Sequence, residues 1–204
     1  RHCLMERKEY SAGAVKVCFW FSEFRKVVTL LDEGNSMEDV KDLNQRKNIF
    51  SAPTPLRASQ IFSTVSARVN SLDRSFYPLF LESDLATQKL FTLVGAMAHD
   101  TLFFDFVYEV IREKMIIGTN ELPDSDVRVF FKNKQIQSEK VAGWTDITLN
   151  RLGRCYRTML YEAGVIDKSK NARRIFKPIL TPERYRWLEG HGMEIFINAL
   201  TGVR

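Results

Sequence analysis

Apolar residues recur along most of the chain at the three- and four-residue spacing of amphipathic helices. Turn and capping residues such as Gly34, Ser36, Pro55 and Gly118 separate these stretches. The pattern predicts helices over residues 15–31, 37–44, 55–72, 76–82, 84–98, 101–117, 123–135, 145–163 and 193–200, with one more that starts at residue 181. The phenylalanine-rich helix at 101–117 is more typical of a central core helix than of an aromatic ligand pocket.

The segment from Val165 to Leu180 departs from this helical pattern. Two short apolar pieces, 165–166 and 175–176, flank a polar and basic centre, which predicts a β-hairpin. A helix, a turn, a helix and a basic hairpin follow one another in a winged helix-turn-helix. We therefore predict an all-α fold, with an N-terminal helical domain at 1–118 and a C-terminal winged helix-turn-helix containing a short β-hairpin at 119–204.

The positive charge of the chain is concentrated in this second predicted domain. A net charge of +5 and a pI near 9.1 are by themselves a weak sign of nucleic-acid binding. Between Thr145 and Trp187, however, ten basic and four acidic residues give a net charge of +6, whereas the rest of the chain has 20 basic and 21 acidic residues. Such a concentration is typical of a nucleic-acid-binding surface.

The predicted helix at 145–163 has the two faces that a recognition helix needs, an apolar back and a polar, basic front. Arginine can donate paired hydrogen bonds to guanine or phosphate, and asparagine can pair with adenine. An ordinary helix with a solvated basic face would give a similar pattern, but the neighbouring basic hairpin favours nucleic-acid binding. The candidate DNA contacts here are Asn150, Arg151, Arg154, Arg157, Lys168, Lys170, Arg173, Arg174 and Lys177.

The helices predicted at 37–44 and 55–72 form a second candidate helix-turn-helix. The outer face of the later helix carries short polar side chains such as Ser66 and Asn70, which can contact phosphates. A plain solvated face fits the same pattern equally well. The candidate DNA contacts of this second element are Lys41, Arg46, Lys47, Arg57 and Arg68.

Signatures of catalysis, metal binding and cofactor binding are absent from the sequence. It contains no phosphate-binding glycine loop, no GxSxG motif and no histidines at metal-ligand spacing. His99 and Asp100 could act as a general base and its orienting group, but Asp100 is better placed to cap the following helix. Cys155 has no nearby histidine in sequence and is predicted to be a buried structural thiol. We therefore expect no enzymatic activity, cofactor, metal or small-molecule substrate.

Cysteine usage and hydropathy indicate the cellular compartment. The three widely spaced cysteines, Cys3, Cys18 and Cys155, exclude a disulfide framework and are typical of a reducing environment. No apolar run approaches the roughly 18 residues of a membrane span, and the first residues lack the apolar centre of a signal peptide. We expect a cytoplasmic protein that does not contact a membrane.

Several short motifs occur in an order and spacing that resemble a known family. The motifs are YSAG at 10–13, IREK at 111–114, SEKVAGWT at 138–145, TL at 148–149, RL at 151–152 and EAGVI at 162–166. They are similar to those of the BrxA family, an accessory component of BREX bacteriophage-exclusion systems, over residues 10–200. The region FSAP at 50–53 is less typical, since the family tends to be more basic there, which favours the C-terminal DNA contact over the N-terminal one.

The resemblance implies an all-helical protein, sometimes compared to the NusB antitermination fold, that serves a defence system against phage. Together with the basic C-terminal domain, it leads us to expect a non-enzymatic protein whose partners are double-stranded DNA and other BREX components. Two alternatives stay open. One is an RNA-binding protein of NusB type, and the other is a protein-interaction scaffold within the defence complex.

Overall fold

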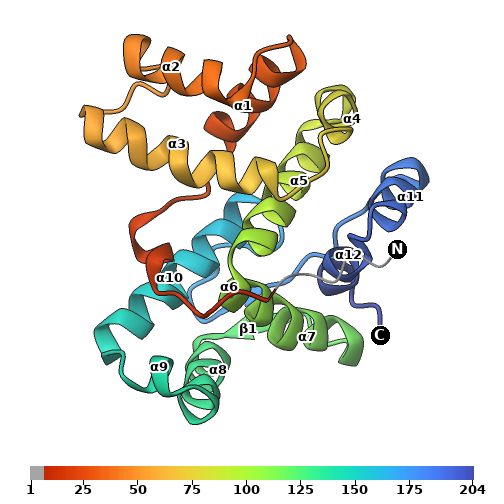
Figure 1. Ribbon diagram of the computed structural model, residues 1–204. Helices are drawn as coiled ribbons and strands as arrows, with labels where there is room; N and C mark the ends of the chain where they lie inside the picture. Colours follow the sequence, from red (N-terminus) through yellow and green to blue (C-terminus); the bar gives the residue numbers. More distant parts are fainter. Residues whose placement is uncertain (1–6) are drawn as a thin grey trace. The chain divides into compact units, whose positions relative to one another are not determined.

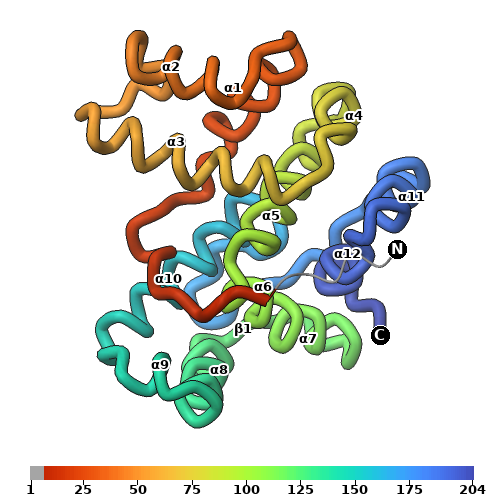
Figure 2. The backbone as a smooth tube through the Cα atoms, viewed as in Figure 1, coloured from red at the N-terminus to blue at the C-terminus, as the bar shows by residue number. Residues whose placement is uncertain are grey.

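The computed structural model describes residues 7–204, which are mainly helical (Figures 1 and 2). The all-α fold class is therefore confirmed, while Cys3 lies outside the described residues. The chain forms two compact units. The first unit combines the chain up to Cys18 with Asp100–Arg204, and the second unit is Phe19–His99. This division differs from the domain boundary expected at residue 118.

The helix that follows His99 belongs to the first unit because its aromatic side chains pack there. The ring centroid of Phe106 lies 5.2 Å from that of Phe130 and 5.5 Å from that of Tyr156. Phe103 also contacts Tyr156, with 5.0 Å between the ring centroids, and all four side chains are buried. Periodicity identifies such a helix but not the neighbours that its apolar face meets, so the sequence alone does not place this helix in either unit.

The second unit is helical throughout and has an aromatic core. It contains α1 (Phe21–Asp32), α2 (Met37–Lys47), α3 (Pro55–Asn70), α4 (Phe76–Glu82) and α5 (Leu85–His99). Helix α3 packs against α1, α2 and α5, and α4 packs against α1 and α5. In the core, the ring centroid of Phe80 lies 5.6 Å from that of Phe24 and 6.3 Å from that of Phe91.

Two helices of the second unit begin where the capping residues predict. Ser36 and Asp39 form a capping box at the start of α2, in which each side chain accepts a hydrogen bond from the other residue's backbone N–H. At the start of α3, Thr54 Oγ1 accepts a hydrogen bond of 3.1 Å from the backbone N–H of Arg57, and Pro55 is the first helical residue.

The single helix predicted at 15–31 is wrong in its first part. Residues Gly13–Lys16 form a short 3-10 helix, η1, and α1 begins only at Phe21. Between them Val17 is extended and Trp20 has a left-handed backbone with φ 53°, which no continuous helix allows. The apolar run is divided between the two units. Element η1 packs on α10 within the first unit, whereas the buried Phe19 belongs to the second.

The first unit holds the remaining elements. After η1 these are α6 (Thr101–Phe106), the π-helical turn η2 (Val107–Ile111), α7 (Arg112–Ile117), β1 (Glu121–Pro123), α8 (Asp124–Gln137), α9 (Glu139–Ala142), α10 (Asp146–Glu162), β2 (Ala172–Arg174), α11 (Pro182–Gly190) and α12 (Glu194–Thr201). Helix α10 packs against α8 and η1, and α12 packs against η2, α7 and α11.

A small two-stranded sheet in the first unit joins the segment before α8 to the segment after α10. Ile166 pairs with Ile175 in an antiparallel bridge, as the predicted hairpin requires. Strand β2 also pairs antiparallel with β1, which places Leu122 opposite Arg173. The sequence analysis missed β1, because three residues are too few to show an alternating pattern.

A buried ionic cluster holds the N-terminal segment against α6 and α8. Arg7 donates two hydrogen bonds, of 2.9 and 2.8 Å, to the carboxylate of Asp105, which also accepts one from the hydroxyl of Tyr10. The Nζ of Lys134, whose side chain is only 2% exposed, donates to Glu109 at 2.9 Å and lies 3.4 Å from Asp105. Burial raises the pKa of Asp105, but the hydrogen bonds from Arg7 and Tyr10 outweigh it and hold this pKa below its usual value.

We predict that Asp105→Asn lowers the free energy of unfolding by about 3 kcal/mol at pH 7, because a buried lysine then loses a carboxylate partner. Because the folded pKa of Asp105 is depressed, its contribution is present above its unfolded pKa of about 3.9 and is lost as the pH falls through the folded pKa. The difference between wild type and variant should shrink below about pH 4, as urea unfolding between pH 7 and pH 3 would measure.

The ionisation of Lys134 does not contribute to the stability change expected between pH 7 and pH 3. Burial lowers the pKa of Lys134, but the hydrogen bond to Glu109 and other partners outweigh it and raise this pKa, so its contribution is lost only in alkaline solution. Glu9→Gln is a suitable control, since its ion pair with Lys140 is exposed and is worth less than about 1 kcal/mol. A stability difference for Asp105→Asn that stays constant from pH 7 to pH 3 would contradict this account.

Candidate nucleic-acid interface

Helix α10 has the two faces that the sequence predicts. Its back is buried, and Leu152, Tyr156 and Leu160 have no exposed surface. Asn150 and Arg154 are exposed on the opposite face. The hydroxyl of Thr145 caps the helix by accepting a hydrogen bond of 3.2 Å from the backbone N–H of Thr148. The burial of one face fixes the helix on the first unit and leaves its polar side chains available to a partner.

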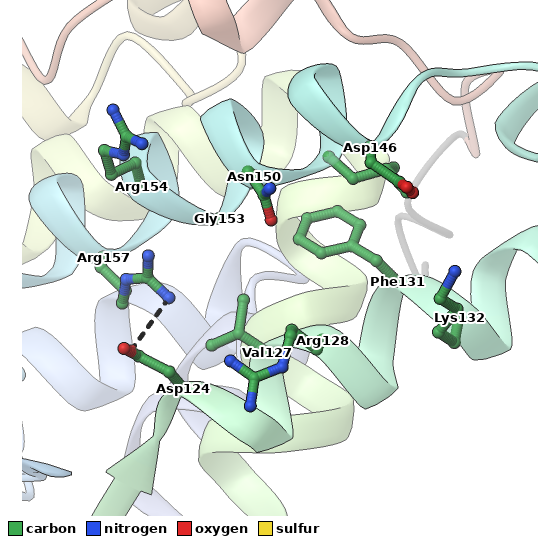
Figure 3. A pocket seen from close by; sticks show the side chains of 11 residues that line it. Asp124, Val127, Arg128, Phe131, Lys132, Asp146, Asn150, Gly153, Arg154 and Arg157 are labelled. Carbon is green, nitrogen blue, oxygen red and sulfur yellow. Dashed lines mark ion pairs between the residues drawn. The ribbon is translucent and has the colours of Figure 1, made fainter. Parts of the chain in front are cut away.

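An open groove lies between α8 and α10, and we call it the α8–α10 groove. In Figure 3, Asp124 lies beside Arg157 at one end and Lys132 lies toward Asp146 at the other, so the two helices run in roughly opposite directions. The lining residues are Asp124, Val127, Arg128, Phe131, Lys132, Asp146, Leu149, Asn150, Gly153, Arg154 and Arg157. The groove thus combines four cations and two carboxylates above buried apolar side chains.

A glycine permits the close approach of the two helices that form this groove. Gly153 lies on α10 where the helix faces α8, and it is buried. A Cβ atom at this position would lie 2.9 Å from Cγ1 of Val127 and 3.5 Å from Cε2 of Phe131. A larger side chain would require Val127 or the helix that carries it to shift, so the glycine permits the present close packing of α8 on α10.

A single carboxylate joins α8, α10 and β2. Oδ1 of Asp124 lies 3.3 Å from Nη1 of Arg157 and 3.0 Å from Nη1 of Arg173. Burial lowers the pKa of Arg157, and the ion pair with Asp124 opposes that effect. The two arginines were predicted as DNA contacts, but the structure holds both against Asp124, and their side chains are only 16% and 25% exposed.

The segment that follows α10, including β2, carries further cations. Lys168, Lys170, Arg174 and Lys177 are exposed, and the Nζ of Lys168 lies 4.5 Å from the ring centroid of Tyr161. The carboxylate of Asp167 accepts hydrogen bonds from the backbone N–H groups of Arg174 and Ser169, which orders this turn and lowers the pKa of Asp167. A smaller pocket connects this turn with α10 and is lined by Arg154, Arg157, Thr158, Tyr161, Glu162, Lys168 and Arg173.

The sequence analysis missed two basic residues of this surface, Arg128 and Lys132. Both are exposed on α8 and line the α8–α10 groove across from Asn150 and Arg154. Their spacing of four residues places them on one face of α8, which is the signal that could have revealed them. The charge count that began at Thr145 excluded α8, and so it excluded both residues.

The second candidate element, in the second unit, is only partly exposed. Lys41, Arg46 and Lys47 are exposed on α2. Arg57 is half-buried, with its guanidinium carbon 5.1 Å from the ring centroid of Trp20. Arg68 and Ser66 are buried, and Arg68 Nη1 donates a hydrogen bond of 2.9 Å to the carbonyl oxygen of Phe19. The prediction that Arg68 and Ser66 contact DNA is therefore wrong, because helix phase alone did not show that α3 is covered there.

The structure also shows the surroundings of the residues that were considered for catalysis or metal binding. Asp100 caps α6 by accepting a hydrogen bond of 3.1 Å from the backbone N–H of Phe103, as predicted. Cys155 is half-buried on α10, and burial raises the pKa of its thiol. Within residues 7–204 no group of three or more histidine, cysteine or acidic side chains could hold a metal ion.

Membrane-spanning potential is weak in the described part of the chain. No single helix there is both long and apolar enough to cross a membrane. The helices Leu85–His99 and Thr101–Ile117 pass that test only as a broken pair, by length and composition.

The fold and the basic surface define a mainly helical protein with cations concentrated on α8, α10 and the turn before β2. A family model described as BrxA matches residues 8–192. The relative named "BREX protein BrxA" from Bacillus cereus (strain H3081.97) is 37% identical over 182 residues, which are 89% of this chain and 91% of the relative. The relative of the same name from Escherichia coli O9:H4 (strain HS) is 28% identical over 77% of this chain and 73% of its own length. The chain belongs to the BrxA family.

A solved structure shares the fold. The crystal structure of an uncharacterized protein from Magnetospirillum magneticum aligns with a TM-score of 0.79 and covers 96% of this chain and 100% of its own. The two sequences are 19% identical, so this similarity concerns the fold alone.

We predict that Gly153→Ala lowers the free energy of unfolding by about 1–2 kcal/mol. The added methyl group meets the stiff, β-branched side chain of Val127, and this overpacking exceeds the gain in helix propensity of up to about 1 kcal/mol. Gly143→Ala is the matched control, because its Cβ would find no atom closer than 3.5 Å and its backbone φ is −79°. Thermal unfolding of both variants measures the effect. A Gly153→Ala protein as stable as wild type would show that the helices can separate without cost.

Proposed function

We propose that this chain is a non-enzymatic accessory component of a BREX bacteriophage-exclusion system and that it binds double-stranded DNA through its first unit. Membership of the BrxA family supports the BREX role, because the curated relatives carry the name BREX protein BrxA. The basic surface of the first unit supports the DNA-binding role, and the non-enzymatic part of the proposal rests on the sequence, which contains none of the catalytic motifs considered above.

The observation that carries the DNA-binding proposal is the exposed face of α10. Asn150, Arg151 and Arg154 project from a helix whose opposite face is fully buried. An α-helix fits the major groove of B-form DNA, where asparagine and arginine can contact the edges of adenine and guanine. The exposed Lys170 lies in the turn that follows this helix and the exposed Arg174 lies in β2, and both are suited to phosphates of a DNA strand.

The two other hypotheses, RNA binding of NusB type and a scaffold for an acidic protein partner, use the same cations. Proteins that bind single strands usually stack bases on several aromatic side chains, whereas the exposed part of α10 carries asparagine and arginine and a single aromatic residue, Tyr161. Helix α10, with the basic strand β2 in the same unit, is therefore better suited to a duplex than to a single strand. Competition between duplex DNA, single strands and structured RNA separates the first two hypotheses, and negligible affinity for all three would favour the scaffold.

We predict weakly sequence-specific binding to duplex DNA that is mainly electrostatic. If about three to five phosphates are neutralised, the logarithm of the binding constant should fall with the logarithm of salt concentration with a slope of roughly −3 to −5. Arg154→Ala should cost about 1–3 kcal/mol if this side chain reads a base. Fluorescence anisotropy with a labelled duplex over a series of salt concentrations measures both quantities.

Arg174→Glu and Arg57→Glu compare the two candidate surfaces in the same assay. Arg174 is exposed on β2 in the first unit, so its reversal of charge should weaken binding, whereas Arg57 is half-buried on α3 and its reversal should have little effect. The proposal is wrong about the site if Arg174→Glu and Arg154→Ala bind like wild type while Arg57→Glu does not. A flat salt response of the wild-type protein would reject the electrostatic mechanism.

A further inference from the structure

The two walls of the α8–α10 groove carry similar rows of side chains. On α8 the row is Asp124, Arg128 and Lys132, and on α10 it is Asp146, Asn150 and Arg154. Residues four positions apart lie on the same face of a helix, so each wall presents one line of polar groups to the groove. Each row begins with a carboxylate and ends with a cation, and the two rows run in opposite directions (Figure 3).

The carboxylate at one end of the groove is already neutralised by the protein itself. Asp124 is bound to Arg157 and Arg173, so these three groups contribute little free charge to a ligand. The cations farther along both walls are not neutralised in this way. No carboxylate in the described part of the chain forms an ion pair with Arg128, Lys132 or Arg154. Three charged side chains from two helices thus line one groove without an acidic partner.

We infer that the α8–α10 groove binds the phosphate backbone of nucleic acid, with Arg128 and Lys132 of α8 as phosphate contacts. This inference rests on the proposed DNA binding and extends the interface from α10 to α8, whose basic residues were not among the candidate DNA contacts. Arg154 approaches the same groove from the opposite wall, and Asn150 lies beside it. Arg157 instead has a positioning role, because its ion pair with Asp124 ties α10 to the start of α8.

The chemistry of the groove favours phosphate groups over other anions. Guanidinium groups bind phosphate oxygens with paired hydrogen bonds, and the lysine adds a point charge on the same wall. The floor contains the buried apolar side chains of Val127, Phe131 and Leu149, which keep water from the base of the groove. Charges beside such a surface are less screened than charges in open solvent. A series of phosphates, one charge per nucleotide, matches a line of cations along a helix.

The test is a double variant, Arg128→Ala with Lys132→Ala, in the full chain. Each lost phosphate contact should reduce the magnitude of the log–log salt slope by about 1, so the double variant should lose about 2 and bind a short duplex about tenfold or more weakly at low salt. Arg128→Lys keeps the charge and should retain the wild-type slope. Both residues are exposed, so the melting temperature should stay within the range of ordinary surface substitutions.

The matched control removes two exposed cations outside the groove, Arg74→Ala with Arg186→Ala, and should leave the slope unchanged. The inference is overturned if the Arg128/Lys132 variant binds like wild type while Arg154→Ala still weakens binding; the proposed function would survive that result. If wild type binds no duplex at all, both the inference and the proposed function fail. If a poly-glutamate peptide displaces the duplex at equal charge concentration, the groove is a general anion site and the phosphate assignment is wrong.

Discussion

The packing of the apolar back of α10 onto the aromatic core of the first unit is the interaction on which the basic surface depends. Tyr156 is fully buried, and its ring lies 5.0 Å from that of Phe103 and 5.9 Å from that of Phe131. Because the back of the helix is fixed, the side chains of its front have defined positions. Gly153 adds the second constraint, since only a residue without a side chain lets α8 approach α10 closely enough to form the groove.

Two kinds of charge interaction have different consequences in this unit. The buried cluster around Asp105 and Lys134 holds the N-terminal segment in place. At the surface, Asp124 binds two arginines and joins α8, α10 and β2, while the remaining cations of the groove have no acidic partner among residues 7–204. The protein thus uses part of its positive charge to hold its own helices together and leaves these remaining groove cations exposed without an ion pair to a described residue.

Local signals in the sequence predicted much of the fold. Capping by Ser36, Thr54 and Asp100 identified helix starts, because such caps depend only on residues within one turn. The spacing of apolar residues also predicted which face of α10 is buried. Long-range packing was not accessible in this way, which explains why the first predicted helix was too long and why β1 was missed.

The sequence also could not predict the surroundings of individual side chains in the candidate site. Charge counting found Arg154 and Lys170, which are exposed, but it could not tell that Arg157 would pair with Asp124 or that Arg68 would be buried. Burial and ion pairing depend on which helices meet, and no single segment of sequence contains that information. For the same reason Arg128 and Lys132 emerged only when α8 and α10 were seen to form one groove.

Footprinting of lysine side chains tests the central claim most directly. The full chain is treated with an amine-reactive acetylating reagent in the presence and absence of a short DNA duplex, and the modified lysines are quantified by mass spectrometry. If the first unit binds DNA, the duplex should protect Lys132 and Lys170 and leave Lys41 and Lys47 as reactive as before, since all four are exposed without DNA. Protection of Lys41 and Lys47, with Lys132 and Lys170 unchanged, would contradict the account.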